Sequence, residues 1–135
     1  RLRSKYQNSF VEIVNETTFS SASYLLTEKT LNSVYGCCFP IILSGAGVVA
    51  HLRALGFDVF DDIVDHSYDA ITNPIDRLGS AIELNKKLLC DHDYVKRTWQ
   101  ANQSRFEGNV TTARTTMYDW YRKRTIDQFS RVKWQ

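Results

Sequence analysis

The sequence predicts an α/β fold, a half-Rossmann three-layer parallel sheet with additional C-terminal helices. Two short apolar runs, residues 10–14 and 39–43, are separated by a helix-like segment at residues 27–36. The order strand, helix, strand is that of a βαβ unit, whose two strands run parallel. The second run shows no alternation of apolar and polar residues, which is expected of a strand covered on both faces.

The helix of this unit is predicted from its ends. Thr27 is a residue type that caps helix N-termini with its hydroxyl, and Glu28 in the first turn complements the helix dipole. Apolar residues then recur at helical spacing as far as Gly36, which can end the helix.

A second helix is predicted at residues 47–55, because apolar residues recur at helical spacing and Gly56 can stop the helix. Residues 57–60 follow directly and are rich in β-branched and aromatic side chains, so we predict a short third strand there. The turn at residues 44–47 contains two glycines but not the full GxGxxG pattern. We interpret it as a tight turn rather than a phosphate-binding loop.

The second half of the chain is predicted to be helical. Asn73 followed by Pro74 is a strong helix start, and this helix is expected to run to about Cys90. Asp91 opens a further helical region that extends to the end of the chain, and a break within it is predicted at residues 108–109.

Length and composition predict a single domain over residues 1–135, with an α/β core at 10–90 and a helical extension at 91–135. No apolar run approaches the ~18 residues of a membrane span, and no signal-peptide core is found. Three cysteines without CxxC spacing fit core positions in a reducing compartment. We therefore expect a cytoplasmic protein. Because the only methionine is Met117, we expect a piece of a longer protein.

Charge is unevenly distributed along the chain. Residues 95–135 hold nine Lys and Arg against three Asp and Glu, or +6, whereas the first 94 residues hold eight against twelve, or −4. We interpret the basic tail as a solvated helical face and do not expect a nucleic-acid partner. The alternatives are nucleic acid, an anionic membrane or an anion-binding partner domain.

The predicted carboxyl edge of the sheet carries the candidate site. Ligands of parallel sheets bind where loops leave the carboxyl ends of the strands. The start of the helix at Thr27 offers unpaired N–H groups and a positive dipole end, so we expect an anion such as a phosphate there. Lys29 adds a full charge, and Glu28 can accept hydrogen bonds from vicinal hydroxyls. The alternative is a helix-start carboxylate beside a surface lysine.

His66 lies among Asp65, Ser67 and Asp69, a pattern that could indicate acid–base or metal chemistry. No second histidine falls at a ligand spacing, so we predict a structural or helix-capping role for His66. We expect neither a metal nor a cofactor.

Residues 24–30, Tyr-Leu-Leu-Thr-Glu-Lys-Thr, precede a helix and then residues 39–45, Phe-Pro-Ile-Ile-Leu-Ser-Gly. This arrangement resembles the donor-binding half of α1,3-fucosyltransferase-like glycosyltransferases, in which a Tyr-x-Thr-Glu-Lys segment precedes a helix and a Pro-Ile/Val strand. Residues 52–60 and 64–69 resemble viral and marine microbial proteins that share the segment.

The resemblance implies a two-lobed GT-B enzyme, whose C-terminal lobe binds a nucleotide sugar such as GDP-fucose. In that case Lys29 would neutralise the diphosphate and Glu28 would hold the ribose hydroxyls. Asn15 or Glu16 would stand where the family's Glu-Asn pair contacts the donor, although the order here is Asn-Glu and the following loop is longer. The substrate-binding candidates are Asn15, Glu16, Tyr24, Thr27, Glu28 and Lys29.

In that family the proposed general base belongs to the N-terminal lobe, which we expect to be missing from this chain. The resemblance therefore assigns no catalytic residue here and implies an isolated chain without turnover. Two other functions fit the sequence. One is a non-catalytic interaction module, whose basic helical tail binds a partner or nucleic acid, and the other is a different phosphate-ligand enzyme on the same scaffold.

Overall fold

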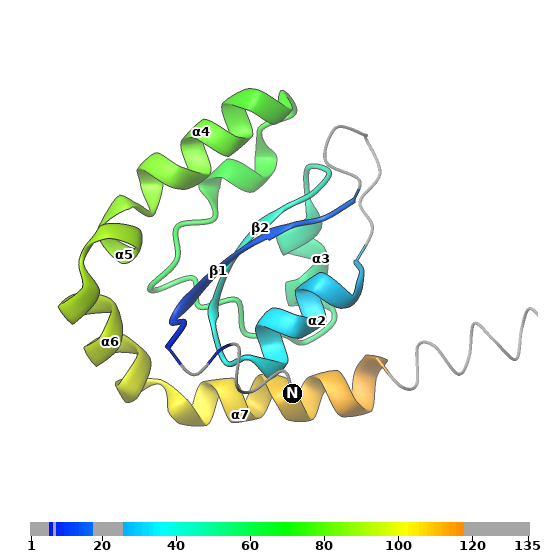
Figure 1. Ribbon diagram of the computed structural model, residues 1–135. Coiled ribbons are helices and arrows are strands. Elements are labelled where there is room, and N and C mark those ends of the chain that lie inside the picture. The colour runs from blue at the N-terminus through cyan, green and yellow to red at the C-terminus, as the bar shows by residue number, and fades with distance from the viewer. Residues whose placement is uncertain (1–5, 7, 18–25, 118–135) are drawn as a thin grey trace, which may run out of the picture.

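The computed structural model describes residues 6, 8–17 and 26–117, and shows a mixed α/β fold with helices around a two-stranded parallel sheet (Figure 1). In chain order the elements are β1 (Val11–Asn15), α2 (Glu28–Tyr35), β2 (Phe39–Leu43), α3 (Val48–Ala54), the 3-10 helix η1 (Ser67–Ala70), α4 (Pro74–Leu84), α5 (Lys86–Cys90), α6 (His92–Ala101), α7 (Gln103–Thr112) and the π-helical turn η2 (Ala113–Met117). The end of the basic tail, residues 118–135, lies outside the described residues.

The predicted βαβ unit is confirmed. β1 and β2 pair in parallel, with Val11 opposite Phe39 and Asn15 opposite Leu43, and α2 connects them. Thr27 is the N-cap of α2 and accepts a hydrogen bond from the Lys29 backbone N–H. This arrangement places the start of α2 beside the carboxyl end of β1 (Figure 1).

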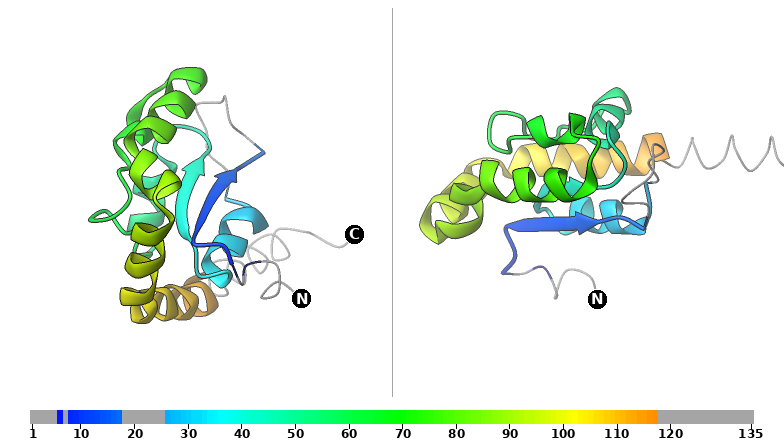
Figure 2. Two further views of the ribbon diagram at one scale, coloured as in Figure 1. Left: turned by 60° about the vertical axis from the view of Figure 1, so that its left-hand side comes forward. Right: turned by 90° about the horizontal axis from the view of Figure 1, so that it is seen from above.

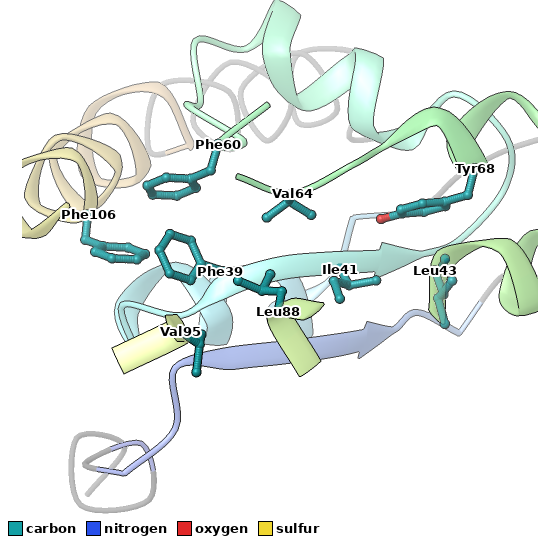
Figure 3. Packing of buried hydrophobic residues seen from close by; sticks show 10 residues of the cluster. Phe39, Ile41, Leu43, Phe60, Val64, Tyr68, Leu88, Val95 and Phe106 are labelled. Carbon is teal, nitrogen blue, oxygen red and sulfur yellow. The ribbon is translucent and has the colours of Figure 1, made fainter. Parts of the chain in front are cut away.

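β2 is buried along its whole length, as predicted for a strand covered on both faces. On one face Phe39, Ile41 and Leu43 pack against side chains from the second half of the chain (Figure 3). On the other face Val14 and Ile42 pack with residues of α2 and α3. Figure 2 shows the same division, with α4, α5 and α6 in an arc along one side of the sheet and α2 on the other.

The prediction of a third strand at residues 57–60 is wrong, because side chains take the backbone groups that a neighbouring strand would use. The Asp58 N–H donates to Oδ1 of Asn109 at 2.9 Å, and Nδ2 of Asn109 donates to the Asp58 carbonyl at 2.7 Å. The Val59 carbonyl accepts from Nε2 of His66 at 2.8 Å.

The second edge of β2 is also engaged by a side chain. The Ile42 N–H donates to the Tyr68 hydroxyl at 2.9 Å, and Phe60 has a φ of 61°, a left-handed conformation that an extended strand does not contain. The sheet therefore has two strands in the described residues, and the three-layer half-Rossmann sheet is not present there. The α/β class is confirmed.

Two helix boundaries differ from those predicted from the sequence. The helix expected from Asn73 to about Cys90 breaks at Asn85, whose side chain bonds the Ala81 carbonyl and both backbone groups of Asp65. The break predicted at residues 108–109 is wrong: both residues lie inside α7, where the Asn109 side chain bonds the backbone N–H and carbonyl of Asp58. The chain turns at Asn102, between α6 and α7.

Gly56 ends α3 as predicted, in a left-handed conformation with a φ of 89°. Its N–H donates to the Arg53 carbonyl, and the Phe57 N–H donates to the Leu52 carbonyl. These are the two hydrogen bonds of a Schellman motif. Gly56→Ala is expected to lower the free energy of unfolding by about 1–2 kcal/mol, because a Cβ is strained in this conformation.

Urea denaturation measures that loss, and Gly108→Ala is the matched control. Gly108 lies within α7 with no atom near the position of an added Cβ, so this change is expected to stabilise the protein by about 0.5–1 kcal/mol. Equal effects of the two substitutions would contradict the conformational explanation.

No helix among residues 6, 8–17 and 26–117 has the length and apolar character needed to cross a membrane.

Candidate functional site

A groove of about 670 Å³ lies at the carboxyl ends of β1 and β2, next to the start of α2. One part of its lining is apolar and the rest is polar or charged. The lining residues are Ile13, Asn15, Glu16, Thr17, Lys29, Leu43 and Leu78. The position is the one that parallel sheets use for ligands.

Glu16 ties the end of β1 to the start of α2. Its side chain is 2% exposed, and its carboxylate accepts three hydrogen bonds. The Thr27 N–H donates at 3.0 Å, the Thr30 hydroxyl donates at 2.6 Å, and the Thr27 hydroxyl is the third donor. The Glu16 N–H in turn donates to the Leu43 carbonyl at 2.9 Å, which extends the pairing with β2 by one residue.

These contacts keep Glu16 ionised. Burial alone would raise the pKa of this carboxyl, but the hydrogen bonds from Thr27 and Thr30 favour the charged form more strongly. The net result is a Glu16 pKa below its ordinary value. A negative charge is therefore fixed inside the fold at the first turn of α2.

The anion expected at the start of α2 is thus supplied by the protein itself. The Glu16 carboxylate binds the Thr27 N–H, and the Lys29 N–H donates to the Thr27 hydroxyl at 3.3 Å. A phosphate at this helix start would have to displace Glu16 or lie beside its charge. The helix start alone consequently makes a poor phosphate site in this chain.

Lys29 projects to the groove, where its ammonium donates to the Thr17 hydroxyl at 2.9 Å. Within the described residues it forms no ion pair with a carboxylate. The neighbouring Glu28 is exposed and does not line this groove. Its role at a ribose stays a prediction.

The structure brings three of the six candidate residues together in the groove, namely Asn15, Glu16 and Lys29. Thr27 does not line the groove; it bonds Glu16 and caps α2. Tyr24 lies outside the described residues. Asn15 is exposed at the end of β1. Sequence reasoning missed four lining residues, which are Ile13, Thr17, Leu43 and Leu78. The strand register, which pairs Asn15 with Leu43, could have identified Leu43 and Ile13.

The glycine-containing turn at residues 44–47 leads into α3, and the start of that helix is also occupied by a carboxylate. Oδ2 of Asp69 accepts from the Val49 N–H at 3.1 Å and from the Ala50 N–H at 3.3 Å. The Asp69 carbonyl accepts from the Gly47 N–H at 3.0 Å. The turn serves the packing of α3 against η1, in agreement with its interpretation as a tight turn.

His66 is structural, as predicted. It is buried, with Nε2 donating to the Val59 carbonyl and Nδ1 lying 3.2 Å from the Tyr68 hydroxyl. Because Nε2 carries the hydrogen of the neutral ring, Nδ1 accepts from the Tyr68 hydroxyl, which itself accepts from the Ile42 N–H. Burial lowers the pKa of His66, which keeps the ring neutral.

A second, polar depression of about 520 Å³ lies beside His66, lined mainly by Arg53, Asp61, Asp62, Asp65 and Ser67. Its charged side chains already have hydrogen-bond partners within the protein. Arg53 makes two hydrogen bonds to Asp61, Asp62 bonds Arg105 from α7, and Asp65 accepts from Ser67. In the part of the chain that the structure describes, no group of three His, Cys, Asp or Glu side chains is placed to hold a metal ion.

Comparisons of the chain with protein families, curated proteins and solved structures find no match.

Proposed function

We propose that the chain is the nucleotide-sugar-binding lobe of a glycosyltransferase, and that the groove at the carboxyl ends of β1 and β2 holds the donor. One observation carries the proposal. The ammonium of Lys29 lies in a groove at the ligand-binding edge of a parallel sheet, without an ion-pair partner among the described residues. The resemblance of residues 24–45 to fucosyltransferase-like enzymes supports the same function.

The lining suits a phosphate attached to a partly apolar body. The ammonium of Lys29 and the hydroxyl of Thr17 are donors for phosphate oxygens. Ile13, Leu43 and Leu78 supply apolar surface for a base or sugar ring. The exposed amide of Asn15 can bind either a base edge or a sugar hydroxyl.

In the proposed reaction an acceptor hydroxyl displaces the nucleotide from the sugar. The acceptor needs a general base to take its proton, and this role is assigned to no residue of the chain. The leaving phosphate gains negative charge as the bond to the sugar breaks. Lys29 would stabilise that charge, because a fixed cation interacts most strongly with an oxygen whose charge increases.

Calorimetric titration with GDP, UDP and CMP tests the proposal. At least one of them is expected to bind wild type, and Lys29→Ala is expected to weaken binding by about 1.5–3 kcal/mol, because a charge-assisted contact is lost. Lys96→Ala is the control, since Lys96 is exposed on α6 away from the groove. If Lys29→Ala binds as tightly as wild type, Lys29 is not part of the site.

One observation favours the rival function, a non-catalytic interaction module. α4 exposes two isoleucines seven positions apart, Ile75 at 70% and Ile82 at 41%, on a surface adjacent to groove residue Leu78. Such a module would bind none of the three nucleotides. Its self-association or partner binding would be lost in the double variant Ile75→Ser with Ile82→Ser, measured by sedimentation.

A further inference from the structure

Two connections join the end of β1 to the first turn of α2. In the first, the Glu16 carboxylate accepts from the Thr27 N–H and from the hydroxyls of Thr27 and Thr30. In the second, the Lys29 ammonium donates to the hydroxyl of Thr17, the residue that follows Glu16, at 2.9 Å. Both connections therefore use the same two segments of the chain.

The contacts of Glu16 fix the backbone from which Lys29 projects. Thr27 and Thr30 precede and follow Lys29 at the start of α2, and the same carboxylate holds both. The Lys29 N–H also donates to the Thr27 hydroxyl, which itself donates to Glu16. The direction of the Lys29 side chain is therefore set by contacts that form before any ligand binds.

The carboxylate of Glu16 is turned to α2 and away from a ligand. Glu16 is 2% exposed, and both of its carboxylate oxygens already accept hydrogen bonds within the protein. Lys29 is half-buried, and it lines the groove. The resemblance to fucosyltransferase-like enzymes implies a direct contact between this position and the donor, whereas the structure gives Glu16 contacts to Thr27 and Thr30.

From this geometry we infer that Glu16 is a positioning residue for Lys29. It holds the first turn of α2 so that the ammonium lies at the groove, where a phosphate of the ligand binds it, and its carboxylate does not contact the ligand. A long side chain that is ordered in advance loses less conformational entropy when a ligand binds. The inference rests on the proposed nucleotide-binding function and assigns Glu16 an indirect role within it.

Nucleotide affinity separates positioning from direct contact. The probe is whichever of GDP, UDP and CMP binds the full chain most tightly, followed by NMR titration. Glu16→Ala is expected to weaken binding about 5- to 10-fold, the cost of ordering one long side chain. Glu16→Gln can still bond Thr27 and Thr30 and should stay within about twofold of wild type.

The same substitution in the Lys29→Ala background decides between the two roles. If Glu16 acts through Lys29, Glu16→Ala has no further effect on affinity once the ammonium is gone. An undiminished effect in that background would mean that Glu16 contacts the ligand itself, and would overturn the inference.

Thr30→Val keeps the inference testable if Glu16→Ala does not fold. The Thr30 hydroxyl is buried, does not line the groove and donates to Glu16 at 2.6 Å. Its removal is expected to weaken binding about threefold, and this effect should disappear in Lys29→Ala. Ser33→Ala is the control and should bind as wild type does, because this buried hydroxyl of α2 donates to the Thr30 carbonyl and not to Glu16. Equal affinities of Thr30→Val and wild type would overturn the inference.

The position of Lys29 can also be measured without a ligand. We expect a nuclear Overhauser effect between the Lys29 side chain and the Thr17 methyl group in wild type. It should persist in Glu16→Gln and be lost in Glu16→Ala, and an unchanged intensity in Glu16→Ala would overturn the inference. Absence of binding by all three nucleotides would refute the proposed function, while the Overhauser effect still decides whether Glu16 positions Lys29.

Discussion

Phe39→Ala is expected to lower the free energy of unfolding by about 3–5 kcal/mol, the range for truncating a buried phenylalanine. Phe39 is fully buried, and its ring packs at 5.1 Å, centroid to centroid, from the rings of both Phe60 and Phe106. It therefore connects β2 to the segment after α3 and to α7 (Figure 3). Alanine would leave a cavity where these three parts of the chain meet.

Equilibrium denaturation in urea measures this loss. The control is Ile75→Ala, which truncates a side chain that is 70% exposed on α4 and should change stability by less than about 0.5 kcal/mol. A similarly small effect of Phe39→Ala would mean that α7 does not pack on β2 as described.

Glu16→Ala is expected to lower the free energy of unfolding by about 2–4 kcal/mol. The substitution removes a buried carboxylate that accepts from the Thr27 N–H and from the hydroxyls of Thr27 and Thr30. Hydrogen bonds to a charged group are the stronger ones, and donors left unpaired in a buried position add a further cost. Glu28→Ala removes an exposed carboxylate in the first turn of α2. It is expected to change the free energy of unfolding, measured by urea denaturation, much less than Glu16→Ala does.

The contribution of Glu16 should also depend on pH. Its folded-state pKa is lowered from the ordinary value of 4.5, so the unfolded chain takes up the proton first as the pH falls. The stabilisation is complete above about pH 4.5 and is lost as the pH falls through the lower folded-state pKa. The difference in stability between wild type and Glu16→Gln, followed by urea denaturation in acid, is expected to shrink over this range. A difference that does not vary with pH would contradict the lowered pKa.

The parts of the fold with strong local signals could be predicted from the sequence. The cap at Thr27, the glycine at Gly56 and the uninterrupted apolar run of β2 each specify their element through nearby residues. The prediction of a third strand failed because the conformation of residues 57–60 depends on side chains that are distant in the sequence. Asn109 from α7 and His66 from the following loop form hydrogen bonds with the backbone of residues 58 and 59. No residue within 57–60 indicates these contacts.

The candidate site was predictable to a similar extent. The order of strand and helix was enough to place Asn15, Glu16 and Lys29 at one edge of the sheet. It was not enough to show that Glu16 turns inward and binds the start of α2, since that depends on where Thr27 and Thr30 lie relative to the end of β1. Leu78 enters the groove from α4, which no motif links to β1.

Amide NMR spectra of the full chain during a titration with CMP test the central claim most directly, namely that a phosphate-bearing nucleotide occupies the groove at the carboxyl ends of β1 and β2. The account predicts saturable shifts concentrated at groove residues, including Asn15, Thr17 and Lys29, and loss of these shifts in Lys29→Ala. Saturable shifts centred on the exposed face of α4 or on the depression beside His66, with the groove unchanged, would contradict it.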